Sequence, residues 1–425
     1  MKEEFFSIPT KFLNTTCHYF IKQYKKNSMI GRLPAFVANC EINPSLKIAI
    51  LERGNEVLSK VRISGGGRCN VTHAEFVPKE LSQNYPRGEK ELLGPFHIFM
   101  TGDTMEWFEK RGVELKIEDD GRIFPISDSS ESIINCFLSE VERLKIHVLK
   151  NHSVQDLEEK EGIWEVKTNK GDFSAEKIML ATGSNPKMWK FLANLGHTIV
   201  PAVPSLFTFN IKDERIKGLA GIATEASVQI KFNSKNTNLE SKGPLLVTHW
   251  GMSGPAILKL SAWGARELHS ENYKFQIMVN WLPEKNSEAI IEELKELKLK
   301  EAKKQVIKYS RFGLPKRLWQ SLVNAAEINS EITWAEINKN QLETLSNQLC
   351  KAEFQVDGKS TFKEEFVTAG GVDLKEVNFK TFESRLHKNL YLAGEVLNID
   401  AITGGFNFQN AWTGGCLAAK AISED

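Results

Sequence analysis

Short apolar runs and longer amphipathic stretches alternate along most of the chain. The run 46–51 is apolar and ends at an acid, Glu52, which is the pattern of a buried parallel strand. Similar runs predict strands at 146–149, 164–168, 177–180 and 389–393, and amphipathic stretches predict helices at 101–112, 130–144 and 409–422. This alternation predicts an α/β fold.

The middle of the chain has a different pattern. From about 190 to 282, short strand-like runs are broken by Gly and Pro, which predicts an antiparallel sheet or barrel. Residues 283–350 are rich in Glu, Lys and Leu and predict helices, with the run 284–304 forming a solvated helix face. Residues 352–356 and 361–367 alternate on either side of Asp357-Gly358, which predicts a hairpin.

Composition excludes several classes of protein. The 425 residues contain 55 Lys and Arg against 54 Asp and Glu, a net charge of +1, so we expect no nucleic-acid partner. The six cysteines are scattered without C-x-x-C spacing, which predicts neither a disulfide framework nor a metal site. Because no run is long and apolar enough to cross a bilayer and no signal peptide is evident, we expect a cytoplasmic protein without a membrane partner.

A triple glycine just downstream of the first strand is the most informative motif. Consecutive glycines lack Cβ atoms and adopt positive φ, so the backbone can approach a planar or anionic ligand closely. By itself the motif is also compatible with a tight surface loop. Its position after Glu52 favours a ligand site, because an acid at the end of a Rossmann strand accepts hydrogen bonds from an adenosine ribose. The candidate residues of this segment are Lys60, Ser64, Gly65, Gly66, Gly67, Arg68 and Asn70.

Two later strands also end in glycine. The strand 390–393 runs into Gly394 and Glu395, and Gly404-Gly405 then precedes the last helix, where backbone N–H groups would face an electron-rich ligand edge. The pyrimidine side of a flavin suits such a site, although a plain turn before a helix would have the same sequence. The strand 178–180 leads to Thr182 and Gly183. Three glycine-bearing strand ends this far apart predict one discontinuous domain with a large insertion.

Five blocks carry a resemblance to a known family. They are I-S-G-G-G-R-C-N-V-T (63–72), D-G-R-I-F-P-I-S (120–127), L-L-V-T-H-W-G-M-S-G-P-A (245–256), V-T-A-G-G-V (367–372) and L-Y-L-A-G-E-V-L-N-I-D-A-I-T-G-G-F-N-F-Q-N-A (390–411). With these blocks the chain resembles the flavoprotein family of NAD(FAD)-utilising dehydrogenases, which includes aminoacetone-oxidase-like and bile-acid dehydro-reductase-like members. The resemblance implies a Rossmann-like FAD-binding domain of the glutathione-reductase type with an inserted β-barrel and a small helical domain.

The resemblance also implies a division of the chain and roles for single residues. The FAD domain would comprise 39–190 and 367–425, the barrel 191–282 and 351–366, and the helical subdomain 283–350. Residues 64–70 would surround the pyrophosphate and the isoalloxazine. The other implied cofactor contacts are Glu52 with the adenosine ribose, Val154 with the adenine, Thr182 and Gly183 beside the cofactor, Gly394 and Glu395 at the ribityl-pyrophosphate, and Asp400, Gly404, Gly405 and Asn407 near the flavin.

The N-terminal segment departs from the flavoprotein pattern. A Rossmann domain needs an apolar strand and G-x-G-x-x-G about 20 residues before the ribose acid. Residues 31–36 read Gly-Arg-Leu-Pro-Ala-Phe, which keeps only the first glycine. We therefore interpret 1–38 as an atypical segment that has replaced the ancestral one, for example through a frameshift or a mis-assigned start. A divergent protein with weakened FAD binding is the alternative.

These patterns predict an FAD-dependent oxidoreductase that transfers a hydride between a small organic substrate and the flavin. Its electron partner would be NAD(P)H, bound transiently, or oxygen, and the sequence does not distinguish the two. His249 is the one candidate proton donor, although a structural histidine is the simpler interpretation. The rival hypothesis is a cofactor-free, inactive remnant that acts as a binding or interaction protein. Neither substrate nor oligomeric state follows from the sequence.

Overall fold

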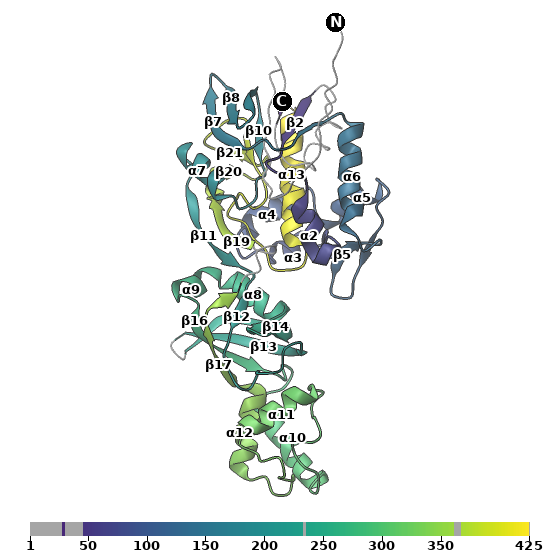
Figure 1. Cartoon of the computed structure of the whole chain (residues 1–425), viewed down its shortest axis with the longest axis vertical. Helices are drawn as coiled ribbons and strands as arrows, with labels where there is room; N and C mark the ends of the chain where they lie inside the picture. The colour runs from purple at the N-terminus through teal and green to yellow at the C-terminus, as the bar shows by residue number, and fades with distance from the viewer. Residues whose placement is uncertain (1–27, 30–45, 233–234, 361–366, 425) are drawn as a thin grey trace. The chain divides into compact units, whose positions relative to one another are not determined.

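The chain forms two compact units. A computed structural model describes residues 28–29, 46–232, 235–360 and 367–424. Unit 1 comprises Met1–Ala202 and Gly370–Asp425, and unit 2 comprises Val203–Ala369 (Figure 1). The chain leaves unit 1 in β11 (Ile199–Ser205) and returns in β19 (Val367–Val372). The boundaries lie within these strands rather than at 190 and 366, because a continuous strand gives no compositional break.

Unit 1 contains the parallel strands that the apolar runs predict. Strand β2 (Lys47–Leu51) pairs in parallel with β6 (His147–Leu149) and with β1 (Ser28–Met29). Strand β10 (Ile178–Leu180) pairs in parallel with β22 (Leu390–Leu392), and all six of their residues are buried. A short antiparallel extension of this sheet consists of β21 (Glu383–Ser384) and β20 (Val377–Asn378). The strand ends therefore bring distant segments of the sequence to common edges.

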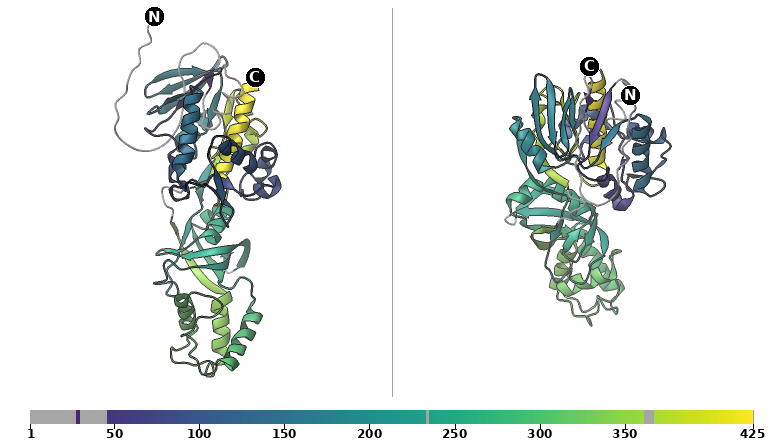
Figure 2. Two further views of the ribbon diagram at one scale, coloured as in Figure 1. Left: turned by 90° about the vertical axis from the view of Figure 1, so that its right-hand side faces the viewer. Right: turned by 45° about the horizontal axis from the view of Figure 1, so that its top comes forward.

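Smaller elements complete unit 1. Two antiparallel sheets have the orders β3 (Thr72–His73), β5 (Arg122–Pro125), β4 (Leu115–Ile117) and β7 (Val154–Lys160), β8 (Ile163–Thr168), β9 (Gly171–Ala175). The helices are α2 (Ser59–Gly67), α3 (Pro78–Ser82), α4 (Glu89–Phe96), α5 (Thr101–Glu109), α6 (Ser130–Arg143), α7 (Pro186–Asn194) and α13 (Phe406–Glu424), with a 3-10 turn at Leu374–Glu376. The C-terminal helix α13 packs against α4, α5, β3 and β22, so it lies in the centre of the unit (Figure 2).

Unit 2 is built on an antiparallel sheet. Its order is β17 (Ala352–Asp357), β16 (Lys274–Asn280), β13 (Ala223–Phe232), β14 (Lys235–Val247), β15 (Gly251–Ser253), β12 (Thr208–Asn210), β18 (Lys359–Ser360). The helices are α8 (Pro255–Trp263), α9 (Ala265–Ser270), α10 (Ser287–Lys300), α11 (Lys316–Ala325) and α12 (Lys339–Cys350). Strands and helices share one hydrophobic core that includes Trp281, Trp319 and Trp334, so the helices form no separate unit.

The first and last strands of this sheet are consecutive in the chain. Only Gly358, at φ +104°, separates β17 from β18, and the two strands pair with opposite ends of the sheet. The sheet thus curls into a barrel. The second strand of the hairpin predicted at Asp357-Gly358 covers 361–367, of which 361–366 lie outside the described residues. Next to the turn itself, β17 pairs with β16 and β18 pairs with β12 rather than with each other.

Candidate functional site

The triple glycine deforms the end of α2 into a tight turn. Backbone angles leave the helical region at Ser64, and Gly65, Gly66 and Gly67 all have positive φ. A Cβ atom on Gly65 would lie 2.9 Å from both the backbone nitrogen of Asn70 and the ring of Phe124, whereas one on Gly66 would have nothing within 4 Å. The turn therefore needs its first glycine for packing, while the second presents bare backbone to open space.

The second glycine pair packs directly against this turn. A Cβ atom on Gly405, at φ +97°, would lie 2.6 Å from the carbonyl oxygen of Thr72 and 2.8 Å from Oδ1 of Asn70. Next to it, Nδ1 of His73 lies 3.1 Å from the carbonyl oxygen of Gly404. Two segments more than 300 residues apart in the sequence thus form one site at the N-terminus of α13, which favours negative charge.

Buried hydrogen bonds hold α13 in this position. The hydroxyls of Thr72 and Thr104 donate to Oε1 of Gln409 at 2.6 and 3.0 Å, and the indole of Trp412 donates to the carbonyl of Val71 at 2.9 Å. Sequence reasoning did not identify Gln409 as a site residue, although it lies within the last matching block. A glutamine at the start of a largely apolar helix was the sequence signal that could have identified it.

Two asparagines have buried polar atoms without a partner among the described residues. They are Oδ1 of Asn70 and both amide atoms of Asn410, and Asn410 is fully buried. Buried polar atoms are almost always hydrogen-bonded to protein, water or a ligand. Oδ1 of Asn70 lies beside Gly405, and the neighbouring backbone of Gly66 faces open space, so this turn fits a planar ligand with hydrogen-bonding edges, such as a flavin.

Glu52 lies at the carboxyl end of β2 and is fully buried. Its Oε1 accepts a hydrogen bond from the backbone N–H of Gly54 at 2.6 Å, and its own N–H donates to Leu149 at 2.9 Å. This fixed, buried carboxylate has the position of a ribose acceptor in Rossmann domains. Val154 is the first residue of β7, and its carbonyl accepts from Nζ of Lys187 at 3.0 Å.

The other glycine-bearing strand ends lie together. Because Leu180 is paired with Leu392, Thr182-Gly183 and Gly394-Glu395 follow adjacent parallel strands. Gly183 and Gly394 both have positive φ, at +65° and +75°. Nζ of Lys60, on α2, contacts Oε2 of Glu395 at 2.8 Å, which links this edge to the triple-glycine helix.

Asp400 and Asn407 make contacts within the protein. Nε of Arg87 donates to Oδ1 of Asp400 at 2.5 Å, and a second guanidinium nitrogen contacts Oδ2, so the buried carboxylate has a bidentate partner. The Asn407 side chain bonds both backbone groups of Ala401, at 3.0 and 3.3 Å. These two residues shape the 400–407 turn. Sequence reasoning did not identify Arg87, because nothing near it in the chain indicates its partner.

Arg68 contacts two acids that lie before and after β5. Its Nη1 contacts Oε1 of Glu118 at 2.6 Å and Oδ1 of Asp128 at 3.2 Å, and its guanidinium lies 3.9 Å from the centre of the Phe124 ring. The hydrogen bond to Glu118 raises the pKa of Arg68. Beside it, burial raises the pKa of the Cys69 thiol to about 12, so this cysteine is no thiolate nucleophile.

His249 belongs to unit 2, whereas all predicted cofactor residues belong to unit 1. It is exposed in the turn between β14 and β15, where it helps to line a hollow of about 520 Å³ with Lys212, Asp213 and Thr248. Oγ1 of Thr248 accepts from the N–H of Gly251 at 3.1 Å and stabilises the turn. Its role as a proton donor stays a prediction.

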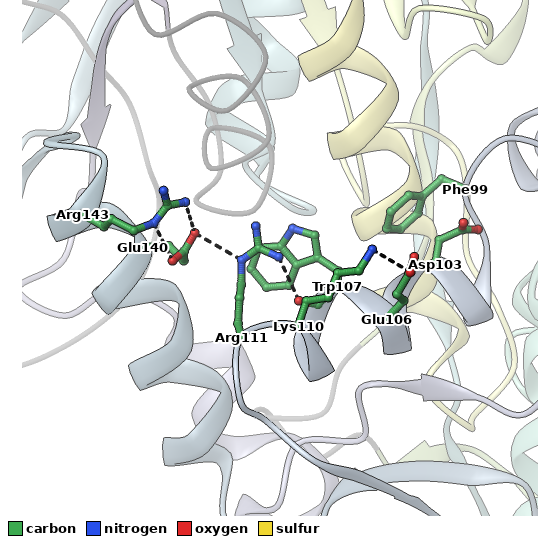
Figure 3. A pocket seen from close by; sticks show the side chains of 8 residues that line it. All are labelled: Phe99, Asp103, Glu106, Trp107, Lys110, Arg111, Glu140 and Arg143. Carbon is green, nitrogen blue, oxygen red and sulfur yellow. Dashed lines mark hydrogen bonds and ion pairs between the residues drawn. The ribbon is translucent and has the colours of Figure 1, made fainter.

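An open hollow of about 620 Å³ on α5 and α6 carries no comparable chemistry (Figure 3). The guanidinium of Arg111 lies 3.9 Å from the centre of the Trp107 ring and contacts Glu140 at 3.2 Å, and Arg143 contacts the same carboxylate at 2.6 Å. Its arginines are neutralised, so we do not assign an anion site here. Within the described ranges there is also no cluster of three His, Cys, Asp or Glu side chains placed to hold a metal, and no helix that could span a bilayer.

Known proteins with similar sequences share almost the whole chain. A 3-dehydro-bile acid delta(4,6)-reductase of Clostridium scindens is 26% identical over 92% of this chain and 96% of its own length. A ribosomal RNA dihydrouridine synthase of Haemophilus influenzae is 27% identical over 95% of this chain and all of its own length. The crystal structure of a 3-ketosteroid-delta4-(5alpha)-dehydrogenase from Rhodococcus jostii is 12% identical, with a TM-score of 0.47 over 94% of this chain and 96% of that protein.

The family described as HI0933-like protein Rossmann domain matches residues 31–421. This match confirms the family and the Rossmann-like fold predicted from the sequence, and the named relatives agree with the predicted enzyme class. The chain belongs to the HI0933-like Rossmann-domain family of FAD-binding oxidoreductases.

Proposed function

We propose that this chain binds FAD at the joined glycine turns and reduces a carbon–carbon double bond conjugated to a carbonyl. The observation that carries the proposal is the packing of Gly405 against Asn70 and Thr72, beside the open backbone of Gly66. Two of the named relatives support the reaction type: a 3-dehydro-bile acid delta(4,6)-reductase and a dihydrouridine synthase both act on double bonds next to a carbonyl group.

In this proposal each segment holds one part of the cofactor. Glu52 accepts hydrogen bonds from the adenosine ribose, and the backbone of Val154 contacts the adenine. The edge formed by Thr182-Gly183 and Gly394-Glu395 approaches the pyrophosphate and ribityl chain. Gly66 and the N-terminus of α13 approach the isoalloxazine ring, where the positive end of the helix stabilises negative charge.

When bound, reduced FAD would supply the hydride that is added to the substrate, and in the opposite direction oxidised FAD would accept a hydride removed from it. The chain itself orients the two partners and supplies the proton. Gln409, held by Thr72 and Thr104, fixes the first turn of α13 against the ring. His249 is our candidate for the proton donor. For reduction of the double bond, NAD(P)H would donate the electrons that re-reduce the flavin, and oxygen would serve as electron acceptor only if the enzyme ran in the oxidative direction. The substrate is a small organic molecule or a base within RNA, as in the two named relatives.

The alternative is a remnant that has lost its cofactor. Residues 31–36, which keep a single glycine of the expected fingerprint, lie outside the described residues. Loss of backbone N–H contacts to the pyrophosphate would weaken binding, since each charge-assisted hydrogen bond contributes about 1.5–3 kcal/mol. Sequencing the parent DNA across codons 20–45 tests the frameshift interpretation, which an intact frame without a hidden G-x-G-x-x-G would contradict.

Flavin binding is tested by the visible absorbance of the purified protein, followed by titration with free FAD. A matched pair of variants locates the site. Gly66 and Gly162 both have positive φ and open space at the Cβ position, so either change to Ala costs about 1–2 kcal/mol of backbone strain. Only Gly66→Ala should also weaken FAD binding, by about tenfold or more, because its methyl group occupies the cofactor's space.

Equal FAD affinity in Gly66→Ala and Gly162→Ala would place the flavin elsewhere. A folded wild-type protein that stays colourless and does not bind added FAD would support the remnant. Turnover of an enone or of a uridine-containing RNA by the FAD-loaded protein, followed as oxidation of NADH or NADPH, then tests the reaction type.

A further inference from the structure

The near-neutral charge of the whole chain conceals a strongly basic segment in unit 2. Residues 295–317 contain nine Lys and Arg and only two Glu, a surplus of seven positive charges. The segment covers the end of α10, the connection that follows it and the first residues of α11. Seven of its cations are exposed, namely Lys295, Lys300, Lys303, Lys304, Lys308, Lys316 and Arg317.

This segment is folded tightly onto the core of unit 2. The backbone N–H of Trp334 donates to the carbonyl of Lys304 at 3.0 Å, and that of Val306 donates to Ile332 at 3.1 Å. The indole of Trp319, on α11, donates to the carbonyl of Val306 at 3.0 Å. The connection between α10 and α11 (Figure 1) is therefore anchored to the core of unit 2.

Some of the exposed lysines in this segment do not stabilise the fold through ion pairs. Lys303, Lys308 and Lys316 have no ion pair in the part of the chain that the structure describes. Lys316 and Arg317 also lie in the first turn of α11, where the positive end of the helix disfavours cations. Arg317 donates from Nη1 to the carbonyl of Gly218 at 3.0 Å, so Lys303, Lys308 and Lys316 are the cations that remain to contact an anionic partner.

An exposed aromatic ring accompanies the charges. The side chain of Tyr309 is 48% exposed, and Nζ of Lys304 lies 5.6 Å from the centre of its ring. Single-stranded nucleic acids bind to surfaces where cations contact the phosphates and exposed aromatic rings stack on bases. Titrations with lipid vesicles and with an acidic polymer separate this interpretation from a lipid surface or an acidic protein, which would also attract the lysines.

We propose that the surface formed by residues 295–317 binds the phosphate backbone of RNA, with Tyr309 as a stacking platform for one base. This inference rests on the proposed function in one respect: it selects RNA from the two substrate classes considered there. Binding itself needs no flavin, so it can be measured whether or not FAD is bound.

The test is the fluorescence anisotropy of a labelled, uridine-rich RNA hairpin titrated with the full-length protein. The variant Lys303→Glu/Lys308→Glu/Lys316→Glu removes three exposed cations that have no ion pair. A control with the same charge change, Lys235→Glu/Lys339→Glu/Lys351→Glu, alters exposed lysines of unit 2 outside the segment. Both variants are first compared with the wild type by circular dichroism and thermal unfolding.

We expect the wild type to bind the hairpin with a steep dependence on salt. The segment variant should bind at least about tenfold more weakly at low salt, and its slope of log K against log salt should be shallower by about 2–3, because each lost phosphate contact removes about 0.7–0.9. The control should change the affinity by less than about threefold. Tyr309→Leu should weaken binding without changing the salt slope.

Three results would overturn the proposal: no RNA binding by the wild type, equal losses in segment and control variants, or equally tight binding of phosphatidylserine vesicles or polyglutamate through the same lysines. The assay is run with and without added FAD. RNA binding by a protein that does not take up FAD would refute the proposed enzyme but support the proposed RNA-binding surface. FAD uptake without RNA binding would refute the RNA-binding surface but support the proposed cofactor site.

Discussion

Replacement of Gly405 by Ala tests whether the two glycine turns form one packed site. The methyl group would lie 2.6 Å from the carbonyl oxygen of Thr72 and 2.8 Å from Oδ1 of Asn70, well inside van der Waals contact. The Thr72 oxygen belongs to the backbone, so the chain itself must move to make room for the methyl group. We expect about 1–2 kcal/mol from positive φ and about 1–3 kcal/mol more from overpacking.

The control for this change is Gly66→Ala, which shares a positive φ but has no atom within 4 Å of its Cβ position. Hydrogen–deuterium exchange of α13 measures local opening in unit 1 without contributions from unit 2. In cofactor-free protein, α13 of Gly405→Ala should exchange about 5–150-fold faster than that of Gly66→Ala, which corresponds to the overpacking cost alone. Equal exchange in the two variants would mean that Gly405 does not contact the Thr72 segment.

Three further predictions concern buried polar groups of unit 1. Arg87→Leu leaves the buried carboxylate of Asp400 without its bidentate partner and should lower the free energy of unfolding in urea by about 3–5 kcal/mol. The double variant Arg87→Leu/Asp400→Leu should recover most of this loss. An equal or larger loss in the double variant would contradict the pairing. Asn410→Leu removes buried amide atoms without a protein partner, so the cofactor-free protein should gain about 1–3 kcal/mol, whereas a lower melting temperature would contradict this expectation. Burial lowers the pKa of His197 despite its 2.8 Å contact with Glu376, so its neutral form stabilises the fold. The free energy of unfolding should be highest above about pH 6.5 and should fall below that pH by at most about 1.4 kcal/mol per pH unit. His197→Gln should flatten this dependence between pH 7.5 and 5.5, and an unchanged slope would assign the dependence to other groups.

The sequence by itself determined the local features of this protein. The apolar run before Glu52 became β2, and Gly65, Gly66 and Gly67 became a turn with positive φ, because strand burial and backbone freedom depend on neighbouring residues. The blocks around Gly404 and Gly405 identified the family, which the match over residues 31–421 confirms. The need for glycine at a turn depends on the local backbone conformation, so it can be recognised from the sequence alone.

Tertiary structure decided which distant groups meet. The pairing of Arg87 with Asp400, the anchoring of Gln409 by Thr72, and the turn of Arg68 toward Glu118 depend on contacts between segments far apart in the chain. The barrel closure at Gly358 likewise depends on two pairing partners that no local alternation reveals. Long-range side-chain contacts form only when the backbone is already placed, because their energy comes from burial and geometry that the folded chain creates.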